Sequence, residues 1–247
     1  MTALFAAELL KLRTIRATWG YILTAVGLAA LVSAGTIGSA SQQERLGPDF
    51  QSRLVADAAG ATTILALLLG VTLLTNEFRH GTITPTLLVT PRRGRLLAAK
   101  LLAAAATGIG IFVLALIVIA AIAIVWLGMV DVPLELGDAA DAAGRVLVSA
   151  AVAGALGAAY GGVVHAQVGA LVGALVWLFV AEPLLGGLLG LIDAEAVADY
   201  LPGAVVFAIA DPASDALAFA PAVGVGLAYV AVASALAALR IGRRDIS

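Results

Sequence analysis

Five long stretches of the chain contain no aspartate, glutamate, lysine or arginine, and they constrain the fold more than any other feature of the sequence. A helix needs about 20 apolar residues to cross a bilayer. Only 12% of the residues are charged, against roughly 25% in soluble domains, and 62% are hydrophobic. A soluble fold of this length could not bury so much apolar surface. The chain is therefore predicted to be an all-α membrane protein, with its spans in the stretches 17–43, 58–76, 101–130, 146–181 and 216–239.

The stretch 146–181 is too long for one transmembrane helix and suits two. His165 and Gln167 interrupt its middle and indicate a tight turn there. The remaining four stretches suit one span each. We therefore expect six transmembrane helices in a single domain, residues 1–247, with both termini on the same side of the membrane.

The basic residues orient these six spans. If the N-terminus is cytoplasmic, 11 of the 14 lysines and arginines fall on the cytoplasmic side, as the positive-inside rule requires. The prediction is a multi-pass protein of the plasma (inner) membrane, with a cytoplasmic N-terminus and a cytoplasmic tail, 240–247. The eleven are Lys11, Arg13, Arg16, Arg79, Arg92, Arg93, Arg95, Lys100, Arg240, Arg243 and Arg244, and the three outer ones are Arg45, Arg53 and Arg145.

The N-terminal segment 1–18 is predicted to form an amphipathic helix. Its charged residues Glu8, Lys11 and Arg13 are expected on other faces than its apolar residues. Such a helix could lie in the inner interface before the chain turns into the membrane. The alternative is a simple helical extension of the first span. The apolar residues at helical spacing are Phe5, Leu9, Leu12, Ile15 and Trp19.

The segment 191–221, between the fifth and sixth spans, contains an apolar piece, 201–210, that is too short to cross a bilayer. This pattern predicts a re-entrant or interface-lying hairpin on the outer face. An ordinary loop that packs a few apolar side chains is the alternative.

Glu182 is the acid that the span assignment places at membrane depth, and Pro183 follows it. A carboxylate in hydrocarbon is costly and normally faces protein or water. Glu182 is therefore a candidate intramembrane polar site for a proton or a substrate. The other interpretation places it at a helix end near the outer headgroups, where the chain breaks before the hairpin.

The sequence carries no pattern typical of an enzyme. It has no cysteine, and both histidines, His80 and His165, are predicted on the cytoplasmic side. The aspartates fall in loops, so no paired intramembrane aspartates are expected. The phosphate-binding pattern G-x-x-x-x-G-K-[ST] is absent. We expect no enzymatic activity, no cofactor and no metal of its own, and the net charge of −2 indicates no nucleic-acid partner.

The basic segment 76–100, NEFRHGTITPTLLVTPRRGRLLAAK, is the one long cytoplasmic loop that this topology contains. Gly81 is predicted to end the helix of the second span. Each of the two Thr-Pro pairs reads as an N-cap followed by proline at the first helical position, which predicts one short helix between them. Leu87 and Leu88 on that helix suit a groove on a cytosolic protein. The alternative is that the arginines only bind anionic lipid and fix the topology.

This segment resembles the pattern E-x-x-x-G-T…L-L-x-T-P-x-R-x-x-x-L-x-x-K of type-2 ABC exporter permeases, and it is the most specific part of the resemblance. ELLKLRTIRATW is similar to the N-terminal elbow of that family, and EPLL, YLPG and RRDI are similar to other parts of it, so the resemblance extends over the whole chain. The matching positions in the loop are Glu77, Gly81, Thr82, Leu87, Leu88, Thr90, Pro91, Arg93 and Lys100.

The resemblance implies that the loop forms a coupling helix that docks on a separate cytosolic ABC ATPase, which binds the ATP. It also implies a second permease copy, identical or related, and export of a substrate across the membrane. We expect no fused ATPase and no large outer domain. The implied docking residues are Glu77, Arg79, Gly81, Thr82, Ile83, Pro85, Leu87, Leu88, Pro91, Arg92 and Arg93.

The apolar spans suit an amphiphilic or hydrophobic substrate, such as a drug, a lipid or a peptide. Two alternatives to an ABC exporter permease remain open at this point. One is a proton-coupled carrier that uses Glu182. The other is a non-transporting membrane subunit that only tethers an ATPase.

Overall fold

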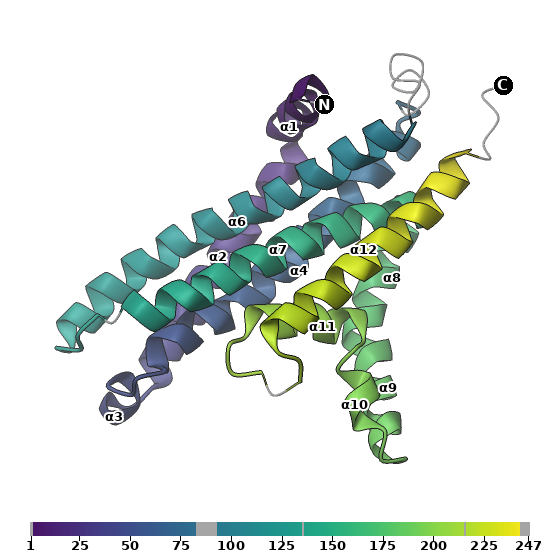
Figure 1. Ribbon diagram of the computed structural model, residues 1–247. Coiled ribbons are helices and arrows are strands. Elements are labelled where there is room, and N and C mark those ends of the chain that lie inside the picture. The colour runs from purple at the N-terminus through teal and green to yellow at the C-terminus, as the bar shows by residue number, and fades with distance from the viewer. Residues whose placement is uncertain (1, 83–92, 135, 215, 243–247) are drawn as a thin grey trace.

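The computed structural model describes residues 2–82, 93–134, 136–214 and 216–242, and these residues form an all-helical bundle without a strand (Figure 1). Six helices in the described part are long and apolar enough to cross a membrane, as predicted. They are α2 (Arg16–Ser39), α4 (Phe50–Arg79), α6 (Arg93–Met129), α7 (Leu136–Val164), the composite helix of α8 (Gln167–Val176), η1 (Trp177–Ala181) and α9 (Glu182–Gly190), and α12 (Phe219–Gly242). The shorter helices are α1 (Thr2–Thr14), α3 (Gln42–Arg45), α10 (Glu195–Ala198) and α11 (Pro202–Ala210).

Helices α4 and α7 form the centre of the bundle. In their most apolar parts 61% and 67% of the residues are buried, against 17% in α8–α9 and in α12. Glycines allow the two backbones to approach closely: a Cβ atom on Gly157 would collide with the Leu67 carbonyl oxygen, and one on Gly161 would lie 2.7 Å from the Val71 carbonyl oxygen. Small residues at such a contact are typical of helix packing in lipid. The backbones of α4 and α7 are therefore in direct contact at these glycines.

The two ends of the bundle differ in charge. The end that we call the basic end holds α1, the last turn of α4, the beginning of α6 and the end of α12 (Figure 1). There Arg240 donates a hydrogen bond to the Val163 carbonyl oxygen at 2.7 Å, and Arg79 donates to Gln167 at 2.8 Å. The opposite end, which we call the acidic end, carries α3 and α10. The predicted turn at His165, whose φ is +62°, joins α7 to α8 at the basic end.

The N-terminal segment forms a helix of its own. Ile15, with φ −83° and ψ 120°, separates α1 from α2, so α1 is not an uninterrupted extension of the first span. Leu12 is buried and, with Phe5 and Leu9, packs against α4 and α6. The expectation that Glu8 lies on another face is wrong, because Glu8 is only 4% exposed. Residues four apart share a helix face, so Glu8 lies on the same buried face as Leu12.

The segment between α9 and α12 folds back against the bundle at its acidic end. Helix α11 has nine residues, too few to cross a bilayer, and it packs on α7 and α12. Six of those residues are buried, and the buried hydroxyl of Ser149 on α7 donates a hydrogen bond to the Val206 carbonyl oxygen at 2.7 Å. The segment therefore contains a short helix, α11, that packs on the spans.

Candidate functional site: a buried ion cluster at the basic end

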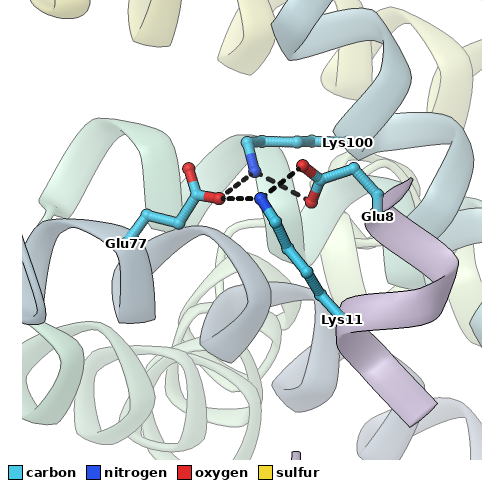
Figure 2. Close-up of polar contacts among 4 residues, drawn as sticks. All are labelled: Glu8, Lys11, Glu77 and Lys100. Carbon is cyan, nitrogen blue, oxygen red and sulfur yellow. Dashed lines mark hydrogen bonds and ion pairs between the residues drawn. The ribbon is translucent and has the colours of Figure 1, made fainter. Parts of the chain in front are cut away.

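Four charged side chains meet inside the basic end and form what we call the ion cluster: Glu8, Lys11, Glu77 and Lys100 (Figure 2). The Lys100 ammonium donates to Glu8 at 2.9 Å and to Glu77 at 2.5 Å. The Lys11 ammonium donates to the same two carboxylates, at 3.0 Å and 3.1 Å. Each lysine therefore bridges both acids.

The ion cluster joins three helices that are distant in the sequence. Glu8 and Lys11 come from α1, Glu77 from the last turn of α4, and Lys100 from the second turn of α6. An apolar layer that includes Leu12 and Leu73 packs beside it and holds α1 against the two spans. The cluster therefore fixes the N-terminal helix to both ends of the segment that links α4 to α6.

Burial makes this pairing obligatory. Lys100 is 1% exposed, Glu8 4% and Glu77 6%. An isolated charge in such a place is strongly unfavourable, and removing one partner of a buried ion pair is far more costly than removing one of a surface pair. Two acids and two lysines balance in charge, but Glu77 Oε2 is buried without a hydrogen-bond partner in the described part of the chain. Loss of either lysine would therefore leave a carboxylate poorly compensated.

The pairing holds both α1 members charged over a wide pH range. Burial alone would raise the pKa of Glu8, but Lys100 and then Lys11 outweigh it, and the net pKa lies below the ordinary 4.5. Burial alone would lower the pKa of Lys11, but Glu8 and Glu77 outweigh it and raise the pKa above 10.5. The stabilisation from Glu8 is thus lost only as the pH falls below about 4.5, and that from Lys11 only as it rises above about 10.5.

The predicted docking residues fall into three groups in the structure. Glu77 is buried in the ion cluster, so it holds the loop from inside rather than presenting a surface. Arg79, Gly81 and Thr82 are exposed, and Gly81, with φ +65°, follows the end of α4 as predicted. Arg93 begins α6. The short helix between the Thr-Pro pairs stays a prediction, because Ile83, Pro85, Leu87, Leu88, Pro91 and Arg92 lie outside the described residues.

The sequence reasoning missed the partnership of these charges. Lys100 was predicted only as one of the basic residues that orient the chain, and Glu77 only as a docking residue. Glu8 was expected on another helix face than the apolar residues. Lys100 Nζ contacts an acid 92 residues away and another 23 residues away, so no local pattern reveals the contacts. The available indication was that Glu77 and Lys100 bracket the basic loop, each at the edge of a long apolar run.

Glu182 has a definite role at the other side of the bundle. Its carboxylate accepts hydrogen bonds from the backbone amides of Gly203 at 2.7 Å and Ala204 at 3.1 Å, and from the indole of Trp177. The two amides belong to the first turn of α11, whose unpaired N–H groups and dipole favour a carboxylate. Glu182 therefore caps α11 from another helix.

The interpretation of Glu182 as a residue at a helix end is wrong. The helix continues beyond it as α9 to Gly190, and the π-helical turn η1 precedes it. A π turn changes the hydrogen-bonding pattern just before Pro183, which lacks an N–H group. The chain thus accommodates the proline without a break and turns Glu182 toward α11.

Replacing Glu182 with alanine is expected to free the first turn of α11. Two amides lose their acceptor, a loss of about 1–3 kcal/mol, so their hydrogen exchange is expected to rise about 5- to 150-fold. Exchange mass spectrometry on peptides that contain Gly203 and Ala204 measures this. Glu195→Ala, which removes an exposed acid of α10, serves as the control. Unchanged protection in Glu182→Ala would contradict the capping role.

The fold and these two polar sites together define a multi-pass, all-helical membrane protein. A scan of protein-family models and a search of curated protein sequences each find no match to the chain.

Proposed function

We propose that the chain is the transmembrane permease subunit of an ATP-binding cassette exporter. A separate cytosolic ATPase docks on the loop between α4 and α6 and supplies the energy. A second permease copy, identical or related, completes the assembly. The substrate is amphiphilic or hydrophobic, and the protein lies in the plasma (inner) membrane with both termini cytoplasmic. In this arrangement α1 is the elbow helix at the inner interface, and α10 and α11 form the outer hairpin.

The ion cluster is the single observation that carries this proposal. A loop that only fixed topology would need no buried anchor, whereas a loop that transmits force needs rigid ends. Glu77 and Lys100 bind each other at the two ends of the loop; Glu77 also binds Lys11 on α1, and Lys100 binds Glu8 on α1. A push on the loop would then move α1, α4 and α6 as one unit, and α4 would pass the motion to α7 through the glycine contact.

The geometry of Glu182 favours this proposal over a proton-coupled carrier. A carrier site needs a carboxylate that exchanges protons or substrate. The Glu182 carboxylate is instead buried and held by three donors, two of which are backbone amides that cap a helix. Its position is that of a structural cap.

Purification of the tagged chain from native membranes in mild detergent tests the proposal. We expect a cytosolic ATPase with a phosphate-binding loop to co-purify in about equal amount, and mass spectrometry identifies it. ATP-driven uptake of a hydrophobic dye into inside-out vesicles then separates a permease from a non-transporting scaffold. Absence of any ATPase, even with crosslinker and nucleotide present, would overturn the proposal.

A further inference from the structure

A cavity of about 290 Å³ lies between the central helices and the outer hairpin. Its walls come from α4, α7, α8 with η1, α11 and α12, so it lies among the spans rather than at the basic end. It is about twice the ~150 Å³ cavity that can hold benzene, and it is close to the lower limit of ~300 Å³ for ligand pockets. The space therefore suits a single chain or a small ring system.

The lining of the cavity excludes a charged ligand. Among the described residues none that lines it is charged, and most of its walls are aliphatic or aromatic. Glu182 lies beside the cavity, but its carboxylate accepts a hydrogen bond from the amide of Gly203, a lining residue. An ion entering the cavity would lose its hydration and find no partner. The occupant is therefore uncharged and largely hydrocarbon.

Three lining residues carry a hydroxyl group. That of Tyr229 donates to the Tyr200 carbonyl oxygen at 2.7 Å, so those of Thr63 and Tyr160 give the cavity its limited polarity. Thr63 lines it, is only 2% exposed, and its Oγ1 has no hydrogen-bond partner in the described part of the chain. Thr62, Thr72 and Thr75 on the same helix instead donate to backbone carbonyls. The Tyr160 hydroxyl also lines the cavity and lies over Gly173, only 2.6 Å from where a Cβ atom would stand. An unpaired buried hydroxyl favours a ligand that carries an oxygen.

The cavity is approached from the hydrocarbon side. Its lining includes Trp177 on η1, which is 40% exposed, and Val232 and Leu236 on α12, which are 60% and 49% exposed. Exposed apolar side chains on membrane spans face lipid. Helices α8, η1 and α9 also run away from the other spans toward the acidic end (Figure 1). A molecule dissolved in the bilayer can therefore reach the cavity between η1 and α12.

We propose that this cavity binds the hydrocarbon chain of an uncharged amphiphile that enters from the bilayer and carries a hydroxyl or carbonyl oxygen. That this amphiphile is the exported substrate rests on the proposed function. The binding itself does not. Glu182 forms the outer closure of the site, because it holds the N-terminus of α11 against η1.

Photolabelling tests the site with hexadecanol that carries a diazirine in the middle of its chain. The tagged protein in native membranes is irradiated with this probe, and labelled peptides are quantified relative to the lipid-facing helix α2. Ala233→Trp places an indole in the cavity, and Ala235→Trp, an exposed alanine on the same helix that does not line it, is the matched control. Filling the space is expected to reduce labelling of α7 and η1 about tenfold, whereas the control keeps it.

A second variant removes polarity without changing volume. Thr63→Val is expected to reduce labelling by the alcohol about fivefold, and to leave labelling by a purely hydrocarbon diazirine unchanged. A probe with the same chain and a trimethylammonium head is expected to label α2 but not the cavity. Equal labelling of all lipid-facing helices, or equal labelling in Ala233→Trp and Ala235→Trp, would overturn the proposal.

Photolabelling and ATPase co-purification, measured on the same membranes, distinguish this binding site from the proposed function. Labelling of the cavity without a co-purifying ATPase would support the binding site and contradict the proposal that the protein is an exporter subunit. Co-purification of an ATPase without labelling of the cavity would support the exporter proposal and contradict the proposed binding site.

Discussion

Replacing Lys100 with methionine is expected to destabilise the protein by about 3–5 kcal/mol, the usual loss when one partner of a buried ion pair is removed. Lys100 is 1% exposed and contacts both Glu8 and Glu77. Without it, the two buried carboxylates share only Lys11, whose side chain is 46% exposed. The change should loosen α1 and both ends of the loop between α4 and α6.

Thermal unfolding in detergent, followed by tryptophan fluorescence, measures this effect. Arg95→Met is the control, because Arg95 is an exposed cation on the same helix, only a little more than one turn away. Adding Glu77→Gln to Lys100→Met leaves one acid with one lysine, so the double variant is expected to recover part of the lost stability. A Lys100→Met protein as stable as Arg95→Met would show that the ion cluster does not hold the three helices together.

Replacing both Leu87 and Leu88 with aspartate is expected to abolish co-purification of the ATPase while the spans stay folded. If the predicted short helix presses these leucines into an apolar groove, two buried carboxylates there would each cost several kcal/mol. Since every 1.4 kcal/mol changes a dissociation constant about tenfold, binding should be lost entirely.

The readout for this variant is the ATPase recovered with the tagged chain, with elution from a sizing column as the measure of folding. Leu46→Asp is the matched control, because Leu46 is 55% exposed and lies at the acidic end, beside α3. Normal recovery of the ATPase with the Leu87/Leu88 variant would show that the loop is not the docking element.

The spans and their order could be predicted because membrane insertion is governed by local composition. An apolar stretch of sufficient length must form a helix, since its backbone groups have no other partners in lipid. The turn at His165 followed in the same way, from two polar residues in an apolar run that is too long for one span. Gly81 marked the end of α4 because glycine tolerates a positive φ.

The polar contacts could not be predicted because they depend on tertiary packing. Glu8 was expected on another face than the apolar residues, yet it is buried and binds Lys100 from α6. Glu182 suggested a functional carboxylate, yet its partners are backbone amides 21 and 22 residues further on, and backbone groups leave no trace in sequence. Charged residues in an apolar chain were visible in the sequence at both sites. The role of each became clear only from the arrangement of the helices around it.

Site-specific photocrosslinking from position 87 tests most directly the central claim, that a separate ATPase docks on the loop between α4 and α6. A benzophenone amino acid replaces Leu87 in one protein and Leu46 in another, and both are irradiated in native membranes. The account predicts that position 87 captures a nucleotide-binding ATPase and that position 46 does not. Capture of lipid alone from position 87, with no protein adduct, would contradict it.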